Sequence, residues 1–124
     1  TSSSADALHA ARELALHTGA AVLVTGRTDY STDGRQVTAT ENGHAMMSRV
    51  TGVGCSMGAL SAACAAVSPT PLQAAVSTAV LMGIAGEMAF EQSPFPGSFA
   101  VSLLDSLYAL SPEDVVRRAR FLSL

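Results

Sequence analysis

The chain has 124 residues, of which 48% are hydrophobic and only 14% charged, and its formal net charge is −3. This length suits one domain with a single core, and so few charges predict either several packed layers or a surface buried against a partner. With no tryptophan, no lysine and no basic stripe, the chain is not expected to bind nucleic acid. It begins at Thr1 without a methionine, so we expect it to be part of a longer polypeptide.

The two cysteines predict neither a disulfide nor a metal site. Cys55 and Cys64 lie on one predicted helix, about 13 Å apart along its axis, which is too far for a disulfide. No CxxC or HxxxH pair is present, so we expect no protein-held metal. Unpaired cysteines and the lack of a signal peptide favour the cytoplasm. The most apolar stretch, residues 74–86, is shorter than the roughly 20 residues of a membrane helix, so no membrane partner is expected.

The first predicted element is a helix over residues 5–18, where apolar side chains recur at helical spacing. Ser3 and Asp6 have the spacing of a capping box, and Gly19 stops the helix. The unbroken apolar run 20–25 follows, which is typical of a strand buried on both faces of a parallel sheet.

A hairpin is predicted next, because residues 30–32 and 36–40 flank the strong turn signal Asp33-Gly34. After a second turn, residues 46–50 are expected to form another strand. Helices are predicted over 54–67 and 72–91, over 99–110 with Ser98 as cap, and in a last helix opened by Ser111-Pro112, where three arginines, Arg117, Arg118 and Arg120, would offset the negative helix end.

This order of elements favours a layered α/β fold with few central strands. A sheet of typical size has five or six strands, and this chain offers fewer. The missing strands are therefore expected to come from another segment or another chain.

The junction at residues 49–55, Arg-Val-Thr-Gly-Val-Gly-Cys, carries the sharpest chemical signal. Glycines between a strand and a helix let backbone N–H groups approach an anion, and the helix N-terminus adds partial positive charge. Cys55 falls in the first helical turn, where a thiol is most easily ionised. An anion hole beside an activatable nucleophile or base suggests acyl or phosphoryl transfer.

The same residues also fit a plain turn. Gly52, Gly54 and Gly58 do not match the spacing of the dinucleotide fingerprint, and the ending of a phosphate-binding P-loop is missing. Glycines that allow close packing and a small buried cysteine would explain the pattern equally well. From the residues alone, both interpretations stay open.

A family resemblance is spread along the chain. It is carried by Val24-Thr25-Gly26, Asp29-Tyr30, Thr32-Asp33-Gly34, Asn42-Gly43-His44, Met47, Arg49-Val50-Thr51-Gly52, Gly54-Cys55, Gly97-Ser98-Phe99, Leu104-Asp105 and Leu107-Tyr108. In this order and spacing, the chain resembles the hydroxyethylthiazole kinases, thiamine-salvage enzymes of the ribokinase-like superfamily. The match is to the C-terminal part of such a kinase, so residues 1–124 are expected to form the C-terminal part of a single ribokinase-like α/β/α domain.

The resemblance implies ATP- and Mg²⁺-dependent phosphorylation of the primary hydroxyl of 4-methyl-5-(2-hydroxyethyl)thiazole. Thr25 would contact the nucleotide and Gly52 the thiazole, while Gly52, Val53, Gly54 and Cys55 would form the anion hole. Cys55 would be the catalytic residue, either as a weak base or mainly as a positioning group, at a position where most relatives in the superfamily carry Asp as the base. Val53 replaces the usual Thr, a change we expect to be tolerated because backbone N–H groups bind the anion. A homotrimer, or a complementing N-terminal segment, is the expected partner.

Two further polar residues could serve this site. His44 follows a turn and could act on the nucleotide side. Glu87 lies in an otherwise apolar helix and, since a lone buried carboxylate is costly, is expected to reach solvent, a capping partner or the mouth of the site, with a metal or nucleotide role as the alternative. Cys64 is expected in the core.

Two other functions compete with the thiazole kinase. One is another ribokinase-like enzyme, such as a hydroxymethylpyrimidine kinase or a hydrate dehydratase of damaged nicotinamide cofactors, although these generally carry Asp where this chain has Cys55. The other is a non-catalytic half-domain that needs a complementing chain. Because much of the sheet and pocket would be missing, the isolated 124-residue chain is expected to have no kinase activity.

Overall fold

The computed structural model describes residues 4–124, so Ser3 of the predicted capping box lies outside the described residues. The elements are α1 (Ser4–Thr18), β1 (Val22–Val24), β2 (Asp29–Thr32), β3 (Val37–Thr40), the 3₁₀ helix η1 (Ala45–Arg49), α2 (Val53–Val67), α3 (Pro71–Gln92), α4 (Pro96–Ala109), α5 (Pro112–Arg118) and β4 (Phe121–Ser123). The predicted α/β class is confirmed.

The four strands form one sheet in the order β1-β2-β3-β4, with every neighbouring pair antiparallel. The predicted hairpin around Asp33-Gly34 is confirmed, with Ser31 of β2 opposite Thr38 of β3. The predicted parallel sheet is wrong for the described residues. β1, β2 and β3 are joined by turns of a few residues and so can pair only in opposite directions, because a parallel pair needs a long crossover. The long connection from β3 to β4 would allow either direction, and the pair is antiparallel.

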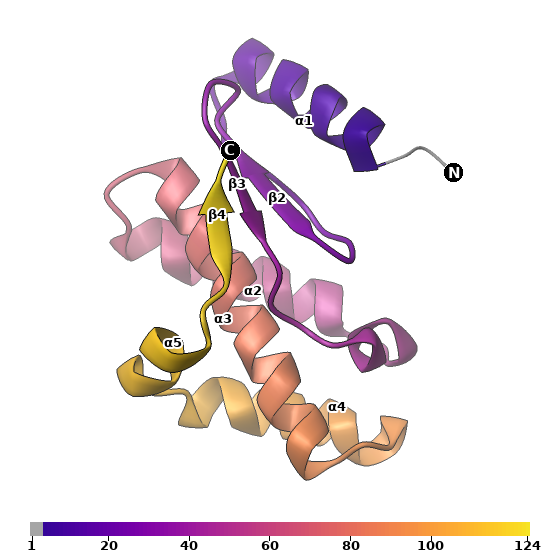
Figure 1. The fold of residues 1–124 in the computed structure, drawn as a ribbon. Coiled ribbons are helices and arrows are strands. Elements are labelled where there is room, and N and C mark those ends of the chain that lie inside the picture. The colour runs from indigo at the N-terminus through magenta and orange to yellow at the C-terminus, as the bar shows by residue number, and fades with distance from the viewer. Residues whose placement is uncertain (1–3) are drawn as a thin grey trace.

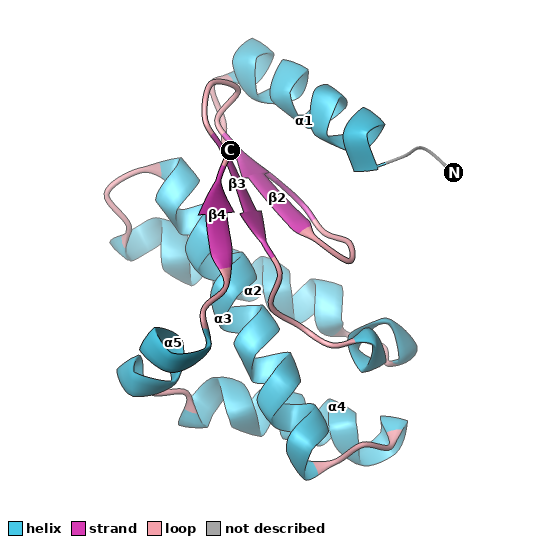
Figure 2. Ribbon diagram, viewed as in Figure 1, coloured by secondary structure: helices cyan, strands magenta, loops and turns pink. Residues whose placement is uncertain are grey.

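β1 also differs from its predicted burial on both faces. Its three residues are only half-buried, and β2 is its one partner strand among residues 4–124. Figure 1 shows α1 on one side of the sheet and α2 and α3 on the other, and the secondary-structure colouring of Figure 2 shows the same layers. In this layered arrangement β1 has one unpaired backbone edge.

The core is centred on α3. Its small and medium side chains pack on α4 to form a buried cluster made of Met82, Ala85, Ala89, Phe99 and Leu103. By length and composition, α3 could cross a membrane, whereas the sequence predicted an apolar stretch of only residues 74–86. However, 56% of the most apolar part of α3 is buried within the fold. Contacts with α2, α4, α5 and three strands account for its apolar character.

The predicted strand over 46–50 is wrong, since most of it lies in the 3₁₀ helix η1. The ring of His44 decides this locally, because its Nδ1 accepts the Met46 backbone N–H at 3.0 Å and so caps a helical turn. Met46 and Met47 then pack against the core cluster instead of alternating across a sheet.

The later helices match their predictions with two corrections. α4 begins three residues early, at Pro96, because proline suits the first helical position and Phe95 takes the cap position that we had assigned to Ser98. α5 has a complete capping box between Ser111 and Asp114 and ends at Arg118, so Arg120 lies beyond it.

Candidate functional site

The first turn of α2 leaves backbone donors open. Gly52 is its cap residue, at φ +94° and ψ −6°, and no side chain caps the helix. The first helical N–H groups have no partner within a helix, and among residues 4–124 nothing accepts those of Val53, Gly54 and Cys55; the Ser56 N–H is the first to bond, to the Gly52 carbonyl at 2.9 Å. Three adjacent donors at a positive helix end can bind an anion.

The structure decides between the two interpretations of the glycines. A Cβ added at Gly52, Gly54 or Gly58 would meet no atom within 4 Å, so close packing within this chain does not require glycine there. The left-handed φ of Gly52 does require it, because other residues are strained in that region. The interpretation as a packing turn with a small buried cysteine is wrong, since Cys55 is exposed.

The cysteines otherwise behave as predicted. Both are free, and Cys64 is buried on α2 while Cys55 is exposed in the first turn of the same helix. The exposed thiol therefore lies beside the open N–H groups, where it can meet a ligand that these groups bind.

Thr25 directly follows β1 and is exposed. The next residue is fixed by Asp29, whose Oδ1 accepts the Gly26 N–H at 2.9 Å. Burial raises the pKa of the Asp29 carboxyl above its ordinary value, and the hydrogen bond from Gly26 partly opposes this. The β1–β2 turn and the start of α2 both lie on the right-hand side of Figure 1. No hydrogen bond joins Thr25 to residues 52–55 within the described part of the chain.

Glu87 and His44 have structural partners. One carboxylate oxygen of Glu87 accepts from the Gly43 N–H, from the side-chain amide of Asn42 and from the guanidinium of Arg120, so its partners are a loop and an arginine and not the expected helix cap. The His44 ring stacks on Phe90 with centroids 3.6 Å apart. Glu87, as a lone acid in an apolar helix, predicted that polar partners would surround it. No pattern in the sequence predicted that these partners would include the loop at residues 42–43.

The arginines near the C-terminus also pair with carboxylates. Arg118 donates two hydrogen bonds to Glu91, which hold the pKa of Glu91 below its ordinary value. Arg117 pairs with Asp114, whose pKa is lowered mainly by the backbone N–H and the hydroxyl of Ser111. Arg117 and Arg118 lie in the last turn of α5, as predicted, and each also makes a specific ion pair.

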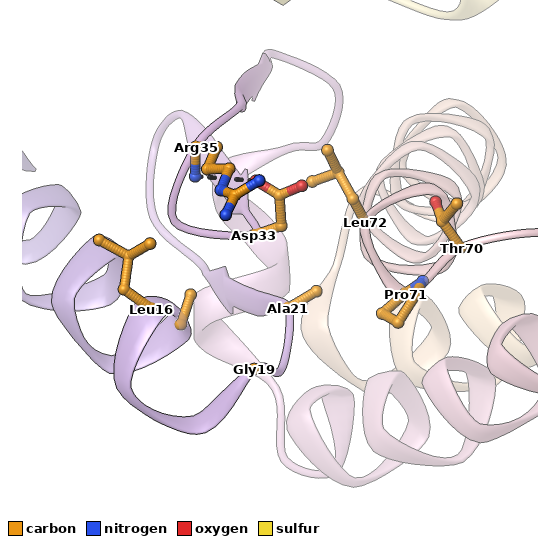
Figure 3. Close-up of a pocket in the computed structure, with 9 residues that line it drawn as sticks. Leu16, Gly19, Ala21, Asp33, Arg35, Thr70, Pro71 and Leu72 are labelled. Carbon is orange, nitrogen blue, oxygen red and sulfur yellow. Dashed lines mark hydrogen bonds between the residues drawn. The ribbon is translucent and has the colours of Figure 1, made fainter.

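No cluster of metal ligands marks the candidate site in the described part of the chain. Among residues 4–124, no group of three or more His, Cys, Asp or Glu side chains could hold a metal ion. A hollow of about 360 Å³ lies elsewhere, between the end of α1, the β2–β3 turn and the start of α3 (Figure 3). It is lined by Leu16, Asp33, Arg35 and Leu72 among others, and by none of the predicted site residues.

The comparisons with known proteins agree on one family. A family model described as the hydroxyethylthiazole kinase family matches residues 1–113. The chain is 99% identical over its full length to a hydroxyethylthiazole kinase of Akkermansia muciniphila, of which it covers 46%. It is 54% identical over 108 residues, 87% of the chain, to the hydroxyethylthiazole kinase of Granulibacter bethesdensis, of which it covers 39%.

A solved structure described as a hydroxyethylthiazole kinase protein from Pyrococcus horikoshii OT3 superposes with a TM-score of 0.91 at 39% identity. The match covers 96% of this chain and 46% of that one. The chain thus spans less than half the length of the curated relatives it matches, and the predicted family resemblance is confirmed.

Proposed function

The chain belongs to the hydroxyethylthiazole kinase family, and we propose that it forms the C-terminal part of an enzyme that phosphorylates the primary hydroxyl of 4-methyl-5-(2-hydroxyethyl)thiazole with ATP. One observation carries the proposal: three open backbone N–H groups and an exposed thiol share the first turn of α2. Phosphoryl transfer needs positioning and charge stabilisation more than covalent chemistry, and this turn offers both.

The backbone of residues 53–55 stabilises the charge on the transferred group. N–H donors that are already aligned need no rearrangement as negative charge develops, so they favour the transition state. Gly52 contributes the bend that aims them and contacts the thiazole. Val53 acts through its N–H alone, which is why its side chain can differ from the usual Thr.

Cys55 is the base that accepts the proton of the substrate hydroxyl. Its exposure allows that contact, and its position beside the N–H groups brings the hydroxyl and the phosphoryl group to the same turn. Thr25 contacts the nucleotide from the exposed end of β1. ATP supplies the γ-phosphoryl group when bound.

Mg²⁺ fits this chain only as an ion held largely by phosphates. Magnesium in such enzymes keeps several waters and is bound by one or two carboxylates together with substrate phosphates. The described residues provide no cluster of acidic ligands. One or two carboxylates, which need no such cluster, would complete the coordination of Mg²⁺ together with the phosphates.

The short coverage supports a missing segment as partner, the family resemblance supports a homotrimer, and the unpaired cysteines support the cytoplasm. The rest of the enzyme, as an N-terminal segment, completes the sheet and the pocket, and the complete enzyme forms a homotrimer in the cytoplasm. The 124-residue chain by itself is expected to be inactive, since it holds less than half of the matched kinases.

The test uses the full-length Akkermansia muciniphila kinase substituted at matching positions. We expect Cys55→Ala to lower kcat by about 10²–10⁴-fold, the usual contribution of a general base, while KM for ATP and for the thiazole changes little. Cys55→Asp should keep substantial turnover, because any proton acceptor would serve. Near-normal turnover of Cys55→Ala would refute the base role. ATP-dependent phosphorylation by the isolated 124-residue chain would refute the need for the remainder.

A panel of acceptor alcohols distinguishes the rival kinase. Preferential phosphorylation of a hydroxymethylpyrimidine over the thiazole would favour a different ribokinase-like enzyme. Loss of all acceptor phosphorylation in the full-length protein would favour a non-catalytic role.

A further inference from the structure

One side of α3 holds the segment that leads from β3 to η1. Residues three or four positions apart lie on the same side of a helix. Four residues of α3 form such a stripe and contact the segment at residues 42–47. Gly83 and Glu87 contact Asn42, Gly86 contacts Met47, and Phe90 contacts His44. A Cβ at Gly83 would lie only 2.5 Å from the Cβ of Asn42, so the two backbones approach more closely than a side chain at position 83 would allow.

Glu87 is the charged member of the stripe. Its Oε1 accepts the Gly43 N–H at 3.0 Å, the Asn42 Nδ2–H at 3.0 Å and an Arg120 N–H at 2.6 Å. The side chain is only 14% exposed, so little water competes for this oxygen. A single atom therefore joins the loop at residues 42–43 to the segment between α5 and β4.

Asn42 makes a second connection between the same two segments. Its Nδ2 also donates to the backbone carbonyl of Arg118 at 2.8 Å, and its Oδ1 accepts the backbone N–H of Arg120 at 2.8 Å. The side chain is buried, and both ends of its amide group are satisfied. The loop is thus held from α3 on one side and from the C-terminal segment on the other.

The connection continues to the candidate site. His44 stacks on Phe90 and caps η1 through Met46. Beyond η1, Val50 and Val53 pack against the core cluster on either side of Gly52. The path from Gly43 to the open N–H groups is therefore short and fixed at both ends.

We propose that Glu87 is a positioning residue for phosphoryl transfer: with Asn42 and Arg120 it fixes residues 43–52, and thereby sets where the first turn of α2 meets the substrate. This rests on the proposed function. Glu87 touches no reacting group. It acts through the loop, where a displacement of about 1 Å is enough to cost on the order of 10²-fold in rate.

The experiment compares Glu87→Gln with Glu91→Gln in the full-length Akkermansia kinase. Glu91 lies one turn further along α3 and pairs with Arg118 at the exposed surface, so it is a matched acid without contact to the loop. At temperatures well below unfolding, Glu87→Gln is expected to lower kcat at least about tenfold with KM for ATP within about twofold. Glu91→Gln should keep kcat within twofold.

Hydrogen exchange provides a readout that does not depend on activity. The peptides that cover residues 43–55 should exchange faster in Glu87→Gln than in Glu91→Gln. Unchanged exchange there, or faster exchange with unchanged kcat, would overturn the positioning role. If the unsubstituted kinase fails to phosphorylate the thiazole, the proposed function fails, and faster exchange would still support the connection from Glu87 to the loop.

Discussion

Two polar regions of this molecule, the first turn of α2 and the cluster around Glu87, differ in how fully their hydrogen-bonding groups are paired. In the first turn of α2, three backbone N–H groups lack acceptors among the described residues, and the neighbouring thiol is exposed. In the cluster around Glu87, one carboxylate oxygen takes three donors, and the amide of Asn42 is satisfied at both ends. Both regions are linked to the same loop, yet one is saturated and the other open.

The difference separates structural from chemical roles. A buried polar group left unpaired costs about 1–3 kcal/mol, so the pairing within the Glu87 cluster favours the folded state. Open donors at the exposed start of a helix are satisfied by water and are free to exchange it for an anion. The saturated region can therefore hold the open region in place.

The glycines test this comparison with the largest effect on stability. Gly83→Ala in the full-length Akkermansia kinase would drive a methyl group into the backbone and Cβ of Asn42, and we expect a loss of about 1–3 kcal/mol in the free energy of unfolding. Gly58→Ala on α2 is the matched control. It meets nothing within this chain and should gain up to about 1 kcal/mol from better helix propensity.

Urea denaturation of both variants measures the difference. Equal stabilities would show that α3 can move away from Asn42 at little cost. A loss at Gly58 would instead mean that another part of the full-length kinase covers this face of α2.

Gly54 sharpens the distinction between folding and chemistry. Its φ is not left-handed and its Cβ would meet no atom, so Gly54→Ala should leave stability unchanged or raise it by up to about 1 kcal/mol. If the phosphoryl group approaches this backbone, the added methyl group will obstruct it, and kcat/KM should fall at least about tenfold. Steady-state kinetics alongside thermal unfolding separate the two effects; unchanged kcat/KM would place the phosphoryl group elsewhere.

Asp29 gives the smallest effect, and it depends on pH. Burial raises its pKa above the ordinary value of 3.8, so the folded state keeps the proton to higher pH than the unfolded chain does. The contribution of Asp29 to stability is therefore complete below pH 3.8 and declines as pH rises through the folded pKa. In Asp29→Asn this decline is absent, while the amide oxygen can still accept from Gly26.

The stability of Asp29→Asn relative to the parent should accordingly increase between pH 4 and pH 7. Urea denaturation across this range measures it. A relative stability that decreases with pH would mean that the hydrogen bond from Gly26 to the charged carboxylate outweighs the effect of burial.

Local signals predicted most of the elements. Helical periodicity located α2 and α3, Asp33-Gly34 located the hairpin, and Ser111-Pro112 located the start of α5. The family resemblance is confirmed, while the interpretation of residues 49–55 as an anion site remains a prediction. The roles of Thr25, Gly52 and Cys55 remain predictions.

The failures had one local and two distant causes. Met46 and Met47 suit a strand, but the cap from His44, two residues before Met46, and the packing of Met47 against Gly86 of α3 make residues 45–49 helical. β1 has the composition of a central strand, yet among the described residues it pairs with β2 alone. The packing of Met47 and the pairing of β1 depend on what lies beside each segment, which the local sequence does not record.

By itself, the sequence determined the helices, the hairpin, the turn before Cys55 and the family. The helices, the hairpin and the turn follow from spacing, glycine conformations and caps that act within a few residues, and the family follows from the resemblance spread along the chain. Only the tertiary structure decided that Cys55 is exposed, that Gly54 and Gly58 are free of packing constraints, and that Glu87 holds the loop at Asn42. The contacts of Glu87, for example, reach Asn42, 45 residues before it, and Arg120, 33 residues after it. No local sequence pattern records contacts over such separations.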